Sequence, residues 1–171
     1  TEQNLFVNKL PQMILEKISN STVDVYPWDY SIIAINNLNW QPRPIIQSYA
    51  SNTSWLDERN VEHFKSATAP EFLIWENNKT SVDINGGDFN SIDNRYLLND
   101  EPKTILELIS NYDHCYSERK FSLYKKRDQP IPILVNSIGE NESTWEKWIK
   151  VPDYDGGILR AKLKFRKTNF I

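Results

Sequence analysis

The sequence predicts an α/β fold: a small three-layer, Rossmann-like sheet with a parallel core, a C-terminal hairpin and an antiparallel β extension. The first observation behind this prediction is a set of short apolar runs, typical of buried strands, at residues 23–26, 45–49 and 72–75. The second is that stretches with helical spacing of apolar residues separate these runs. Each connection is long enough to pass over a face of the sheet, which favours parallel strands joined by right-handed crossovers.

Four segments carry apolar residues at helical spacing, and we expect helices there: 10–18, 31–38, 54–64 and 100–109. Ser54 followed by Asp57 indicates a capping box at the start of the third helix. Asp100 followed by Pro102 indicates the start of the fourth. The stretch 77–99 is rich in Asn, Asp, Ser and Gly, so it predicts a long loop.

Two unlike parts follow one another along the chain. Residues 112–116 and 121–124 predict a hairpin that ends an α/β domain at 1–127. Short strands separated by turn-forming clusters are then predicted at 131–135, 145–151 and 158–165, so we expect residues 128–171 to form a β-rich extension packed on that domain. The last of these segments alternates most clearly, with apolar side chains on one side and basic ones on the other: Leu159, Ala161, Leu163 and Phe165 against Arg160, Lys162, Lys164 and Arg166.

The composition is that of a globular protein, with 39% hydrophobic and 25% charged residues among 171. No apolar run approaches the roughly 18 residues that a membrane helix needs. The chain begins at Thr1 and carries no signal-peptide pattern, so we expect a processed or excised piece of a longer protein. Its single cysteine, Cys115, excludes an internal disulfide.

The net charge of −3 conceals an asymmetry along the chain. Residues 1–119 hold 9 Lys/Arg and 17 Asp/Glu, whereas residues 120–171 hold 11 and 6. The basic C-terminal third is therefore a separate electrostatic unit, suited either to phosphate groups of lipids or lipid-linked sugars or simply to solvent. The acidic remainder argues against nucleic acid as a partner.

Several familiar site classes do not fit the sequence. His114 and Cys115 are neighbours on a predicted strand, so their side chains point to opposite faces and cannot form a catalytic dyad. Too few His and Cys residues are present for a zinc site, and the Asp residues of 83–100 do not follow EF-hand spacing. Neither Gly-Gly pair lies in a phosphate-binding motif. We therefore expect no cofactor and no bound metal.

Polar side chains gather around the first two predicted strands, and strand ends are where α/β folds place binding sites. Arg43 stands between two prolines on a stiff backbone, which suits it either to binding an anion or to anchoring a nearby aspartate. Asp93 and Arg95 lie in the long loop, as a turn with a local ion pair or as part of a site. The candidate ligand-binding residues are Asp24, Trp28, Asp29, Arg43, Gln47, Tyr49, Asp93 and Arg95.

Four segments carry a resemblance to the soluble part of uncharacterised polytopic bacterial membrane proteins: VDVYPWD at 23–29, LNWQPRPIIQSY at 38–49, APEFL at 69–73 and IDNR at 92–95. Those proteins broadly resemble integral-membrane glycosyltransferases, in which a catalytic membrane bundle is followed by an extracytoplasmic α/β domain. The resemblance implies a domain tethered on the outer side of the membrane that is inactive without its missing transmembrane portion. It also implies a role in shaping a site for a glycan or a lipid-linked sugar.

Trp28-Asp29-Tyr30 also resembles part of the Trp-Trp-Asp-Tyr-Gly motif of oligosaccharyltransferase catalytic subunits. Pro27 stands where that motif has its first Trp, and Ser31 where it has Gly, so the acceptor-binding role is not carried over.

Two further functions remain open at this point. One is a stand-alone enzyme acting on carbohydrate through two of the Asp residues. The other is a protein-interaction module that uses the extension with Trp145 and Trp148.

Overall fold

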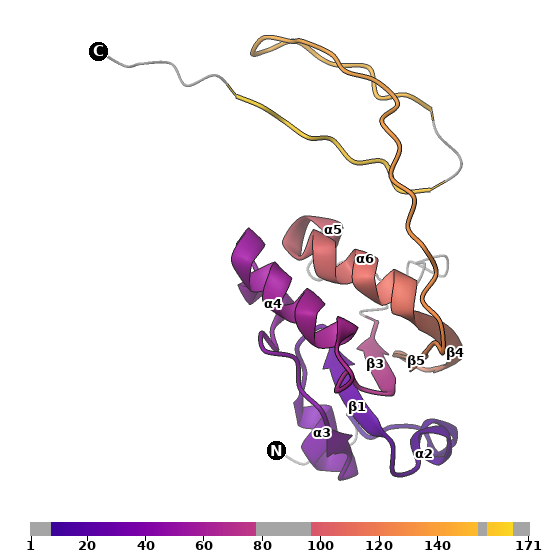
Figure 1. Cartoon of the computed structure of the whole chain (residues 1–171). Helices are drawn as coiled ribbons and strands as arrows, with labels where there is room; N and C mark the ends of the chain where they lie inside the picture. Colours follow the sequence, from indigo (N-terminus) through magenta and orange to yellow (C-terminus); the bar gives the residue numbers. More distant parts are fainter. Residues whose placement is uncertain (1–7, 78–96, 154–156, 166–171) are drawn as a thin grey trace. The chain divides into compact units, whose positions relative to one another are not determined.

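The computed structural model describes residues 8–77, 97–153 and 157–165. The chain divides into two compact units, residues 1–134 and 135–171, and each is considered by itself. All the helices and strands of the described residues belong to the first unit (Figure 1). They are α2 (Gln12–Ile18), β1 (Thr22–Tyr26), α3 (Ser31–Asn36), β2 (Asn39–Trp40), η1 (Ser48–Ala50), α4 (Ser54–Lys65), β3 (Phe72–Glu76), α5 (Leu97–Asp100), α6 (Pro102–Asn111), β4 (Tyr112–Glu118) and β5 (Phe121–Lys126).

The first unit is built on a mixed five-stranded sheet in the order β2-β1-β3-β5-β4. β1 pairs parallel with both β2 and β3, whereas β5 pairs antiparallel with β3 and with β4. Arg119 and Lys120 alone connect β4 to β5, the strands that cover the residues for which the sequence predicts a hairpin. The prediction of an α/β fold is confirmed.

Helices cover both faces of this sheet because successive strand residues point to opposite sides. On one face Val23, Val25 and Ile74 belong to a buried cluster with residues of α2 and α3. On the other face Leu73 and Trp75 belong to a second cluster with residues of α4 and α6. Figure 1 shows α4 and α6 lying side by side on that second face.

The helix starts differ from the predicted caps. The residue that caps α4 is Thr53, whose hydroxyl accepts from Leu56 N at 3.3 Å. Asp57 lies in the first turn of α4 but bonds to a different helix, since its carboxylate accepts from the backbone N–H groups of Lys103 and Thr104 at 3.0 and 2.9 Å. It thereby supplies, across the interface, the N-terminal cap that α6 lacks from its own residues.

The strand predicted at 45–49 is not formed, and its apolar residues lie in an irregular segment that leads into η1. The reason lies in the hydrogen bonds that the backbone of this segment makes. Ile45 N and O bond to the side chain of Asn60 at 2.9 and 3.1 Å, and Ile46 O accepts from Arg43. Because these groups are already paired with side chains, they take no part in a strand ladder. The short β2 occupies the edge of the sheet instead.

The part of the chain after β5 also departs from the prediction. None of residues 127–153 and 157–165 lies in a helix or strand, so the strands predicted at 131–135, 145–151 and 158–165 are absent from the structure. Alternation states only which face of a strand would be apolar, while the strand itself needs a partner for its backbone groups. That residues 128–171 pack on the α/β domain stays a prediction.

Candidate functional site

The carboxyl ends of β1 and β3 lie side by side in the sheet, and from there the chain turns to opposite sides. β1 leads to β2 at one edge, whereas β3 leads to β5 and β4 at the other. In open α/β sheets, ligands bind outside the carboxyl ends of the strands at such a switch point. The sequence directly after β1 is Pro27-Trp28-Asp29-Tyr30, so predicted candidate residues lie at this position.

Five side chains from four parts of the first unit form a connected polar set at this end of the sheet, which we call the carboxyl-end chain. Asp29 accepts from Asn8 Nδ2 at 2.6 Å and from the Ser31 hydroxyl at 2.6 Å. Asn8 Oδ1 in turn accepts from Lys120 Nζ at 2.7 Å, and Lys120 also pairs with Glu76. The set holds two carboxylates and one ammonium in fixed positions, an arrangement suited to hydrogen-bonding hydroxyl groups.

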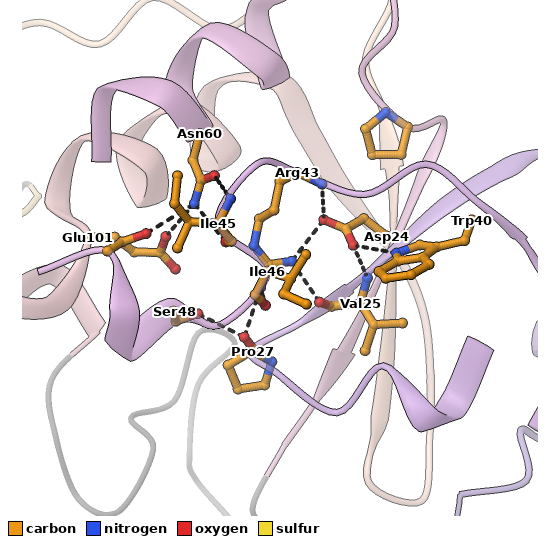
Figure 2. A network of polar contacts seen from close by, with 12 residues as sticks. Asp24, Val25, Pro27, Trp40, Arg43, Ile45, Ile46, Ser48, Asn60 and Glu101 are labelled. Carbon is orange, nitrogen blue, oxygen red and sulfur yellow. Dashed lines mark hydrogen bonds and ion pairs between the residues drawn. The ribbon is translucent and has the colours of Figure 1, made fainter. Parts of the chain in front are cut away.

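A buried ion pair joins β1 to the loop that follows β2 (Figure 2). Arg43 Nη1 lies 2.8 Å from Asp24 Oδ2, and both side chains are almost fully enclosed. The guanidinium also donates to the carbonyl oxygens of Val25, Pro27 and Ile46 at 2.8, 2.8 and 2.5 Å. Of the two roles left open for Arg43, the structure shows the anchoring of Asp24.

The same region contains a second buried acid, Glu101, at the start of α6. Its carboxylate accepts from Asn60 Nδ2 at 3.3 Å. Burial raises the pKa of Glu101 to about 7, although Arg43, Ser48 and Asn60 act to lower it. The pKa of Tyr26 is also raised, first by burial and then by the charge of Glu101. The guanidinium of Arg43 lies over the Tyr26 ring, with Arg43 Cζ 3.7 Å from the centroid of that ring.

Burial opposes the charged form of Arg43, but Tyr26 and Asp24 more than compensate and raise its pKa. Arg43 is therefore a permanent cation inside the unit, held by an anion and three carbonyl groups. The pair fixes the loop over the end of β1 and is closed to a ligand. Sequence reasoning missed Asn60 and Glu101, which carry no local motif, although Glu101 precedes the helix-starting Pro102.

The other predicted candidates lie at or near the surface of the first unit. Trp28 is half-buried and packs against the second core cluster. Gln47 is half-buried directly before η1, and Tyr49 lies within η1 with 42% of its surface exposed. The backbone of η1 is attached to the end of β1, because Ser48 N donates to Pro27 O at 3.2 Å. Asp93 and Arg95 lie outside the described residues.

A separate hollow of about 380 Å³ lies at the opposite end of the sheet, where β4 and β5 meet the segment that follows them. It is lined by Asp113, Cys115, Lys125, Lys126, Arg127, Asp128 and Gln129. Two of its charges neutralise one another, since Arg127 and Asp113 form an ion pair at 2.5 Å. Across the described residues, no group of three His, Cys, Asp or Glu side chains is placed to hold a metal ion.

Comparison with known proteins gives no relative: no protein-family model, curated protein or solved structure matches the chain. Within residues 8–77, 97–153 and 157–165, no helix is long and apolar enough to cross a membrane.

Proposed function

We propose that this chain is a non-catalytic extracytoplasmic domain of a bacterial membrane protein, and that it assists the transfer of cell-envelope glycans or lipid-linked sugars. In this proposal the first unit has the Rossmann-like arrangement expected from the sequence and presents its contact surface at the carboxyl end of β1. The chemistry of transfer belongs to the transmembrane portion of the parent protein.

The observation that carries the proposal is the combination of exposed aromatic rings with positioned polar groups after β1. Tyr30 and Tyr49 expose 47% and 42% of their surface, and Asp29 lies next to Tyr30 in the chain. Aromatic rings supply apolar area with a polar tip, and carboxylate and amide groups hydrogen-bond hydroxyls. A sugar presents both apolar C–H faces and hydroxyl groups, so this surface matches its chemistry.

The state of the acids supports binding over bond cleavage. A glycosidase needs two carboxyl groups that face one another across the sugar. Asp24 is enclosed in its pair with Arg43, and Asp29 accepts three hydrogen bonds from Asn8 and Ser31. Glu101, whose pKa is raised, is buried inside the unit. These arrangements favour the non-catalytic proposal over a stand-alone carbohydrate-active enzyme.

The test is binding of a short-chain prenyl-phosphate-linked N-acetylglucosamine, measured by titration calorimetry on the full chain with the free sugar in parallel. Tyr49→Ala should weaken binding about tenfold, the order of one lost aromatic contact. Met13→Ala is the control, since Met13 is an exposed apolar side chain on α2, the helix that leads into the amino end of β1. Absence of saturable binding, or an equal loss in both variants, contradicts the proposal.

A second candidate function, a protein-interaction module, is favoured by the exposure of aromatic rings in the second unit. Trp145 and Trp148 expose 84% and 101% of their surface. Large exposed apolar side chains mark contact sites for proteins or membranes. A change of oligomeric state on Trp148→Ala, measured by light scattering of the purified chain, would support this function.

A further inference from the structure

The second unit exposes apolar side chains that an isolated soluble domain would bury. Besides Trp145 and Trp148, Leu163 and Phe165 expose 67% and 70% of their surface. Burying a side chain of this size stabilises a protein by about 1.5–3 kcal/mol. When several of them stay in water, the chain lacks that stabilisation. An exposed set of this kind indicates a surface that is covered when the protein is at work.

The charges in the same unit are of one sign near its end. Arg160, Lys162 and Lys164 alternate with apolar residues between 157 and 165, and that stretch holds no acidic residue. The sequence continues with Arg166 and Lys167. A partner for this segment must therefore offer negative charge for the basic side chains and, close beside it, an apolar layer for their neighbours.

A ring contact joins the basic segment to Trp145, one of the two exposed tryptophans. Trp145 and Phe165 stack with their centroids 5.7 Å apart and their planes 15° from parallel. The contact joins two residues that are twenty positions apart in the sequence, and it places Phe165 against the turn that carries Trp145. Apolar rings and basic side chains are combined on one part of the second unit, which we call the basic-aromatic tail (residues 145–148 and 157–165).

We propose that the basic-aromatic tail binds the surface of an anionic phospholipid bilayer. Lipid phosphates pair with Arg160, Lys162 and Lys164, while Trp145, Trp148 and the alternating apolar side chains enter the boundary between headgroups and acyl chains.

A bilayer fits the tail better than a protein partner because of its backbone. The tail contains no strand or helix among its described residues, so many of its backbone groups depend on water. The headgroup layer of a bilayer is hydrated and keeps that water, whereas a dry protein interface would require a new hydrogen-bond partner for each group. Tryptophan is also the side chain that collects at membrane–water boundaries.

The experiment measures binding of the full chain to vesicles by co-sedimentation, with either phosphatidylglycerol mixed into phosphatidylcholine or phosphatidylcholine alone. The tail variant Arg160→Glu/Lys162→Glu/Lys164→Glu removes three favourable contacts and should weaken binding to the anionic vesicles roughly 100-fold. Its matched control makes the same change of net charge on the first unit, at exposed lysines: Lys9→Glu, Lys65→Glu and Lys125→Glu. A second variant, Trp145→Ala/Trp148→Ala, should bind the anionic vesicles at least about tenfold more weakly than the wild-type chain.

The proposal is supported if the wild-type chain binds anionic vesicles, binds neutral ones at least tenfold more weakly, and loses affinity mainly through the tail variants. It is overturned if no vesicles bind, if both vesicle types bind equally, or if the lysine control loses as much as the tail variant. It is also overturned in favour of a protein partner if the chain self-associates without vesicles and the tryptophan variant abolishes that association.

This inference stands apart from glycan binding. The vesicles carry no sugar. In the sugar titration, Tyr49→Ala reports on binding at the surface after β1, so it separates that binding from any contact of the prenyl phosphate with the tail. Failure of either experiment leaves the other interpretable, because every substitution in the tail lies outside the α/β unit.

Discussion

Replacement of Arg43 by methionine should be among the most damaging single substitutions in the first unit. It removes a 2.8 Å ion pair with Asp24 and the hydrogen bonds to three carbonyl groups. Removing one partner of a buried pair costs about 3–5 kcal/mol because it leaves an uncompensated charge. We expect a loss of about 5 kcal/mol once unpaired carbonyl groups are included, comparable with the 5–15 kcal/mol that stabilises a whole domain.

The assay is urea unfolding of the full chain, followed by tryptophan fluorescence and circular dichroism. Arg59→Met is the matched control, since Arg59 lies on α4 in a solvent-exposed pair with Glu62 and should change the free energy of unfolding by about 0.5 kcal/mol or less. Adding Asp24→Asn to Arg43→Met should recover stability, because no unpaired charge then remains buried. If Arg43→Met costs no more than Arg59→Met, the enclosed ion pair is not what holds the loop.

Two further predictions concern buried acids. The pKa of Glu101 is about 7 in the folded protein against an ordinary value of 4.5. Its contribution to stability should therefore be complete below pH 4.5, and about 3 kcal/mol should be lost as pH rises from 4.5 through 7. Glu101→Gln should flatten that part of the stability–pH curve in urea titrations, and an unchanged slope would contradict the assignment. Asp57→Ala should cost about 2–3 kcal/mol by uncapping α6, measured by thermal unfolding, whereas Glu58→Ala, one residue along, should leave the midpoint nearly unchanged.

The sequence predicted those parts of the fold in which one local pattern determines the outcome. The apolar runs at 23–26 and 72–75 became β1 and β3, and helical spacing located α2 and α6, because burial of an apolar face is decided within a few residues. The run at 45–49 looked the same but its backbone bonds to Asn60, fifteen residues away from Ile45. A hydrogen-bond partner that far along the chain does not change the local pattern of apolar residues, so the pattern cannot predict it.

The candidate site shows the same limit. Arg43 between its prolines was recognised as a fixed cation, but only the folded chain shows that Asp24 receives it. Asn8 and Lys120 are separated by 112 positions and still form one hydrogen bond at the carboxyl end of the sheet. Neither residue belongs to a motif, so topology alone brings them together.

In the second unit, alternation at 158–165 predicted a strand that the structure lacks. The pattern shows that the segment is apolar on one side and basic on the other. A strand also needs a neighbouring strand to pair with, which the pattern does not predict. The proposed bilayer contact accounts for that chemistry without requiring a sheet.

The measurement that tests the account most directly is amide chemical-shift mapping of the ¹⁵N-labelled full chain during titration with the prenyl-phosphate-linked N-acetylglucosamine. Glycan binding at the carboxyl end of β1 predicts saturable shifts that cluster at residues 28–31 and 47–49, after β1 and in η1. Shifts confined to the hollow at 113–129, or none at saturating ligand, would contradict a glycan-binding surface at the carboxyl end of β1.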